Sequence, residues 1–144
     1  METLRWKTRI ALLWVLMAVA TSAHLILIVA DPAAMKKLTE WGATAGLGMW
    51  VFSSFFWLIP LWLAFVTMTV KGSANRWANF VVAIIFTLIN IVHFFECGVP
   101  LFKTGPLAGP LAEPTAHHIL LVGSTVVATA LIAWYAWKWP KKEA

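Results

Sequence analysis

The stretch RWANFVVAIIFTLINIVHFFEC, residues 76–97, decides which fold this chain can adopt. It is an apolar segment of helix length in which polar and small residues recur at helical spacing. At about 100° per residue, these side chains share a stripe roughly 60° wide. The stripe consists of Arg76, Asn79, Ala83, Thr87, Asn90 and Cys97. Because lipid offers no hydrogen-bond partner to an amide or a hydroxyl, we expect the stripe to face protein inside a membrane bundle.

The composition indicates an integral membrane protein. Of the 144 residues, 61% are hydrophobic and only 12% are charged, and the apolar residues form blocks long enough to cross a bilayer. The formal net charge of +5 does not indicate nucleic-acid binding, because the basic residues lie at the ends of the apolar blocks. The single cysteine, Cys97, excludes an intramolecular disulfide and a cysteine-paired metal site.

We predict an all-α fold, a polytopic membrane four-helix bundle that forms one domain over residues 1–144. The predicted spans cover residues 6–30, 43–70, 76–96 and 115–139. Asp31 and Pro32 are expected to stop the first span and to begin a short polar connection over residues 31–42, because proline cannot continue a helical hydrogen-bond ladder. Pro60 predicts a kink in the second span.

The distribution of basic residues predicts that both termini are cytoplasmic. With that orientation, eight lysines and arginines lie inside and three outside, as the positive-inside rule requires. The inner group consists of Arg5, Lys7, Arg9, Lys71, Arg76, Lys138, Lys141 and Lys142. An even number of spans agrees with both termini lying on one side of the membrane.

The same topology brings every histidine to the outer half of the membrane. His24 lies about two turns below the outer end of the first span, and His93 lies in the last turn of the third. Two further histidines open the fourth span, and Thr87 and Asn90 extend the polar level inward. We therefore predict a ligand-binding pocket near the outer surface, formed by His24, Thr87, Asn90, His93, Glu96, His117 and His118.

A metal site is the sharpest chemical interpretation of this pocket. His93 and Glu96 stand three residues apart on one helix, and His118 is the third predicted ligand, with His24 or His117 as alternatives. Imidazole and carboxylate suit zinc, copper, iron or manganese, and facing helices of a bundle can gather such ligands. A b-type haem between His24 and another histidine is a further alternative. In the plainest alternative, His117 and His118 are solvated at a helix start and His93 hydrogen-bonds a loop carbonyl.

Two segments carry a resemblance to a known family. Residues 74–90, ANRWANFVVAIIFTLIN, and residues 131–142, LIAWYAWKWPKK, are similar to segments of a family of small bacterial four-span membrane proteins of unknown function. That family opens its third span with Asn-Arg-Trp, matched by residues 75–77, and ends with Trp-Tyr-Ala-Trp-x-Trp-Pro, matched by residues 134–140. The resemblance implies four helices and a bacterial inner-membrane location. It implies no activity, and the family pattern does not include the histidines.

Two classes of function follow from these residues. The first is a non-enzymatic helper. It is either an accessory subunit of a larger membrane complex or a binding protein for a small amphipathic ligand, and its protein partner is a further copy of the chain in a homo-oligomer or the larger complex. Ten tryptophans and nine phenylalanines favour it, because they offer more aromatic surface than four helices need for their own packing. The second is a metal- or haem-dependent membrane enzyme or redox protein that uses the histidine cluster.

Asn90 is expected to contribute about 1 kcal/mol to the stability of the bundle as a contact between helices.

Overall fold

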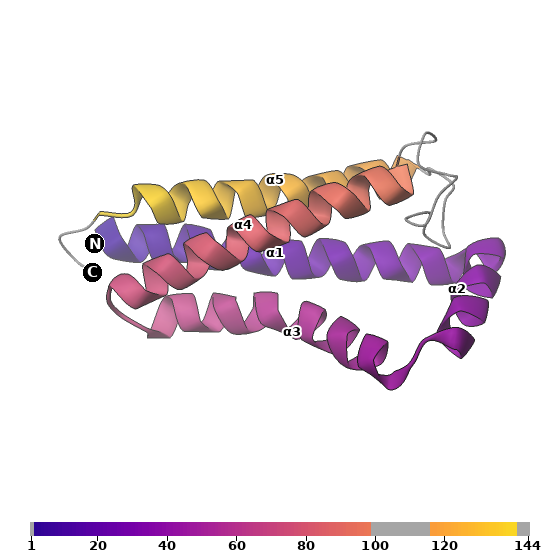
Figure 1. Cartoon of the computed structure of the whole chain (residues 1–144). Coiled ribbons are helices and arrows are strands. Elements are labelled where there is room, and N and C mark those ends of the chain that lie inside the picture. Colours follow the sequence, from indigo (N-terminus) through magenta and orange to yellow (C-terminus); the bar gives the residue numbers. More distant parts are fainter. Residues whose placement is uncertain (1, 99–115, 141–144) are drawn as a thin grey trace.

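The computed structural model describes residues 2–98 and 116–140, and every element in these two ranges is an α-helix (Figure 1). The predicted all-α fold is therefore confirmed. The helices are α1 (Glu2–Ala30), α2 (Pro32–Thr44), α3 (Leu47–Thr69), α4 (Ser73–Gly98) and α5 (Ala116–Lys138). The second predicted span begins at Leu47 rather than at residue 43, because residues 43 and 44 belong to α2.

Length and apolar composition make this chain an integral membrane helical protein. Within the described ranges, three helical stretches are long and apolar enough to cross a membrane: Leu4–Ala30, Ser73–Phe95 and His118–Lys138. A shorter apolar stretch, Ser53–Thr69, lies in α3 where the second span was predicted. The membrane-protein class and its multi-pass character thus follow from the helices themselves.

The segment after the first span is helical, which corrects the predicted polar connection. The Asp31 carboxylate accepts a hydrogen bond from the Ala33 backbone N–H at 2.9 Å, and Pro32 takes the first position of α2. An aspartate cap followed by proline is a strong helix start, because proline lacks only an N–H that would be unpaired there anyway. The same two residues that end α1 therefore begin α2, which lies crosswise at the end of the bundle (Figure 1).

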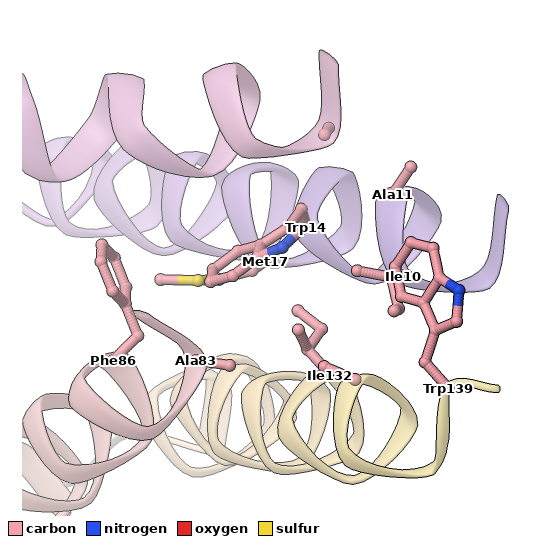
Figure 2. Close-up of a cluster of buried hydrophobic side chains, with 10 residues drawn as sticks. Ile10, Ala11, Trp14, Met17, Ala83, Phe86, Ile132 and Trp139 are labelled. Atoms are coloured by element: carbon pink, nitrogen blue, oxygen red, sulfur yellow. The ribbon is translucent and has the colours of Figure 1, made fainter. Parts of the chain in front are cut away.

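The apolar core lies in the half of the bundle where α1 begins and α5 ends. Figure 2 shows Trp14 and Met17 of α1 facing Ala83 and Phe86 of α4 and Ile132 of α5. The Trp14 indole is completely buried, and its edge meets the Phe86 ring with centroids 5.7 Å apart. Packing among α1, α4 and α5 therefore holds these three helices together in this half of the bundle.

The polar stripe of α4 faces the bundle interior, as the sequence predicted. Asn79 and Ala83 have no exposed surface, and Asn90 is only 4% exposed. Arg76 and Thr87, at the edge of the stripe, are half-buried. The side chain of Cys97 lies outside the described residues.

Asn79 is the centre of a buried polar network that joins three helices. Its Oδ1 accepts hydrogen bonds from Trp14 Nε1 at 2.7 Å and from Thr67 Oγ1 at 2.9 Å. Its Nδ2 donates to Asn75 Oδ1 at 2.8 Å and to the Asn75 carbonyl at 2.9 Å. Both ends of the amide are thus satisfied without water, which is the condition for burying such a group at low cost.

Side chains from α1 and α4 cap the last turn of α3. Lys7 Nζ donates to the Val70 carbonyl at 2.6 Å, and Asn75 Nδ2 donates to the same carbonyl at 2.8 Å. These bonds satisfy a carbonyl that the helix leaves unpaired, and the lysine charge complements the negative end of the helix dipole. The start of α1, the end of α3 and the start of α4 are thereby held at one end of the molecule.

Candidate functional site: a cavity between four helices

The candidate site exists because the first half of α3 stands away from the other helices. Pro60 lies inside α3, and none of the described α3 side chains before it is buried, whereas Pro60, Ala64 and Thr67 are buried. Figure 1 shows α3 bending, with its Leu47 end farther from α1 than its other end. Proline removes one helical hydrogen bond and crowds the preceding turn, so it bends the helix at this point.

A cavity of about 540 Å³ lies between the first half of α3 and the facing parts of α1, α4 and α5. Its volume is in the range of small-molecule sites in proteins. Aromatic and aliphatic side chains form most of its wall, including Phe56, Trp57, Leu88 and Leu121. The polar lining residues are Thr21, His24, Ser53, Asn90, His93 and Thr125. None of the described lining residues carries a fixed charge, so the cavity suits an uncharged molecule.

Three of the predicted histidines meet beside this cavity, one from each of α1, α4 and α5. The His24 ring lies edge-on to His93 with centroids 5.7 Å apart, and edge-on to His118 with centroids 4.4 Å apart. His24 and His118 are buried and His93 is half-buried. His24 and His93 line the cavity, whereas His118 contacts the His24 ring and is not among the described lining residues. The convergence expected from the sequence is confirmed, and a ligand-binding role for these rings stays a prediction.

Asn90 is the lining residue whose hydrogen bonding points most clearly to a ligand. It is 4% exposed, it lines the cavity, and its buried Nδ2 has no hydrogen-bond partner in the described part of the chain. A buried amide donor without an acceptor is unfavourable by about 1 to 3 kcal/mol. An oxygen atom of a bound molecule would supply the acceptor. The expected contact of about 1 kcal/mol with a neighbouring helix is therefore not the role that the structure gives to this donor.

The structure does not bring Thr87 into the cavity. Its hydroxyl donates to the Ala83 carbonyl of its own helix at 2.7 Å, and Thr87 is not among the described lining residues. Such a bond to the preceding turn is the usual arrangement for threonine inside an apolar helix. Thr87 shares the stripe of Asn90, and its neighbour Leu88 lines the cavity.

The metal interpretation rests partly on side chains outside the described residues, namely those of Glu96 and His117. Among the described residues, no group of three or more His, Cys, Asp or Glu side chains is placed to hold a metal ion. The proposed ligand set of His93, Glu96 and His118 therefore stays a prediction, as does haem binding at His24. Elemental analysis and an optical spectrum of the purified protein test both.

Sequence reasoning missed several residues of the cavity, among them Thr21, Ser53 and the aromatic pair Phe56 and Trp57. Thr21 precedes His24 by three residues, so a search for small polar residues one turn from each histidine finds it. Phe56 and Trp57 carry no comparable signal, because lipid-facing aromatic residues in the same helix have the same pattern. Their place in the cavity follows from the bend at Pro60.

Comparison of the chain with protein-family models, with curated proteins and with solved structures finds no match. The cavity and its lining are therefore interpreted from their own chemistry. The resemblance of residues 74–90 and 131–142 to small bacterial four-span proteins stays a prediction.

Proposed function

We propose that this protein binds a small, uncharged and largely apolar molecule that carries a hydrogen-bond-accepting oxygen. The observation that carries the proposal is the buried Asn90 Nδ2, which has no partner within the described residues and belongs to a side chain that lines a cavity of about 540 Å³. The ligand oxygen accepts from Asn90, and the apolar body of the ligand contacts Phe56, Trp57 and Leu88. A membrane protein that holds such a molecule acts as a binding protein or as an accessory subunit of a larger complex.

Several features support selectivity for an oxygen-bearing apolar ligand over an ordinary lipid chain. A hydrocarbon chain could fill the apolar part of the cavity, but it would leave the Asn90 donor unpaired. A charged ligand would have to leave water without meeting an opposite fixed charge among the described lining residues. A carbonyl or ether oxygen on an apolar body satisfies both conditions.

We also propose that the bundle crosses a bacterial inner membrane four times, with α3 as the second span and both termini in the cytoplasm. Support comes from the length of α3, whose 23 residues extend over about 35 Å. Further support comes from the end of the bundle where α1 begins, because Lys7, Lys71 and Arg76 gather there. A basic end on the cytoplasmic side satisfies the positive-inside rule.

Membership of the small bacterial four-span family is part of this proposal. Two of the residues that carry the resemblance bind backbone carbonyls of neighbouring segments at one end of the bundle. Asn75 caps α3 and donates to the Thr67 carbonyl at 3.1 Å, and Arg76 donates to the Trp139 carbonyl at 3.4 Å. The segment of residues 74–90 also includes Leu88, Ile89 and Asn90 of the cavity, whereas the cavity residues of α1 and α3 lie outside both matched segments.

Binding of a matched pair of probes tests the proposed function. A long-chain alkyl phenyl ketone offers an accepting oxygen, and an alkylbenzene of the same length does not. In detergent micelles, calorimetric titration of the full chain should show the ketone binding about tenfold more tightly, the factor expected for one buried hydrogen bond. Asn90→Leu should abolish this difference while both probes still bind, because the leucine keeps the apolar wall and removes the donor.

Thr87→Val is the control for this experiment, because Thr87 is a polar neighbour on the same helix whose hydroxyl bonds to Ala83. This variant should retain the tenfold preference for the ketone. Equal affinities of ketone and alkylbenzene for the unaltered protein would contradict the role of Asn90. A loss of the preference in Thr87→Val as large as in Asn90→Leu would contradict it as well.

A further inference from the structure

A second recess lies at the opposite end of the bundle from the histidines, between the start of α4 and the end of α5. It has a volume of about 190 Å³ and is lined by Arg76, Trp77, Phe80, Ala136 and Trp137. The Trp137 ring lies beside Phe80 at 5.3 Å and beside Trp77 at 6.5 Å between centroids. Three aromatic rings and one guanidinium group thus line a space that is smaller than the cavity at Asn90.

The charge of Arg76 is not neutralised within the described part of the chain. Its guanidinium carbon lies 5.3 Å from the centroid of the Trp77 ring, and Nη1 donates to the Trp139 carbonyl at 3.4 Å. The described residues contain one ion pair, Lys36 with Glu40, and it lies in α2 at the other end of the bundle. A guanidinium has five N–H donors, so one long hydrogen bond leaves most of them for an external acceptor.

The recess lies at the ends of two apolar helices, among residue types that mark the headgroup level of a membrane. Arg76 is in the first turn of α4, and Lys138 is the last residue of α5 with its Nζ 5.1 Å from the Trp134 ring centroid. Tryptophan and basic residues at the ends of membrane helices lie at the level of the headgroups. Trp77 is 46% exposed and Trp137 is 59% exposed, so both rings offer surface to a lipid.

We propose that this recess binds the headgroup of an anionic phospholipid. Arg76 donates to the phosphate oxygens, a charge-assisted contact for which guanidinium is well suited. Trp77, Phe80 and Trp137 contact the glycerol and the first carbons of the acyl chains. The aromatic walls favour a phospholipid over free phosphate, because inorganic phosphate would gain nothing from them. This site is independent of the cavity at Asn90.

Native mass spectrometry of the full chain in detergent, with phosphatidylglycerol and phosphatidylcholine of identical acyl chains, tests the proposal. The unaltered protein should retain phosphatidylglycerol about fivefold over phosphatidylcholine, the factor expected for one basic residue at a membrane surface. Arg76→Gln should bring the ratio close to one, and Arg76→Lys should restore part of it. Arg5→Gln, which removes an exposed arginine of α1 outside the recess, should leave the ratio unchanged.

Trp137→Leu provides a second variant that does not depend on the folding of Arg76→Gln. Because Trp137 is 59% exposed, its replacement leaves the core intact, and retention of phosphatidylglycerol should fall. Trp134→Leu, at 56% exposure and outside the recess, is its control. Equal losses in Arg76→Gln and Arg5→Gln, or in the two tryptophan variants, would overturn the site in favour of general charge or surface effects. Displacement of phosphatidylglycerol by inorganic phosphate would overturn the lipid assignment.

Discussion

Replacing Asn79 with leucine is expected to lower the free energy of unfolding by about 2 to 3 kcal/mol. The leucine removes the acceptor of Trp14 Nε1 and of Thr67 Oγ1, and it removes the donor to Asn75 Oδ1. Trp14 has no exposed surface, so its N–H cannot turn to water when the amide is lost. Equilibrium unfolding in mixed detergent micelles, followed by helical circular dichroism, measures the change.

Asn90→Leu is the matched control for this variant, because it makes the same exchange on the same face of α4. Its Nδ2 has no partner among the described residues, so the free energy of unfolding should stay within about 0.5 kcal/mol or rise. A loss of similar size in both variants would show that Asn90 is also a structural contact. The assignment of Asn79 to stability and of Asn90 to binding would then be wrong.

Replacing Ala83 with phenylalanine is expected to lower the free energy of unfolding by about 1 to 3 kcal/mol, because it overfills a closely packed core. Ala83 has no exposed surface and lies in one cluster with Trp14, Phe86 and Ile132 (Figure 2). Added ring atoms there force neighbouring side chains from their preferred rotamers. The same unfolding measurement in micelles gives the result.

Ala20→Phe adds the same volume at a position that lines the cavity of about 540 Å³. Because that space can accept a ring, the free energy of unfolding should change by less than about 1 kcal/mol. The variant should also lose binding of the alkyl phenyl ketone, since the new ring occupies its place. If Ala20→Phe destabilises as strongly as Ala83→Phe, the space is not available to a ligand and the proposed function is wrong.

The helical class and the interior face of α4 could be predicted from the sequence because both depend on local patterns. The apolar blocks are long, and a stripe containing Asn79 and Asn90 has one stable direction in lipid, toward protein. The convergence of His24, His93 and His118 followed from topology, since each lies near the same end of its helix. These predictions required no knowledge of how helices pack in detail.

The cavity itself could not be predicted, because it depends on a gap between helices. Pro60 predicts a bend in α3, but the sequence does not indicate the direction in which α3 bends away from the other helices. Thr87 shares a stripe with Asn90, but helical spacing alone does not show which residues of a stripe line a cavity, and a ligand-binding role for Thr87 stays a prediction. The Asp31-Pro32 pair predicts the end of the first span and a polar connection, although the same pair serves equally well to start a helix.

Photolabelling with a long-chain aryl ketone tests the central claim most directly, because the excited carbonyl forms a covalent bond where it is held. After irradiation at a ketone concentration well below saturation and peptide mapping, we expect adducts on cavity residues of α4 and α5, namely residues 88–93 and 121–125, and about tenfold fewer of them in Asn90→Leu, which binds the ketone more weakly. Adducts confined to outward-facing side chains such as Phe55, Leu120 and Val127, equal in both proteins, would contradict a ligand site at Asn90.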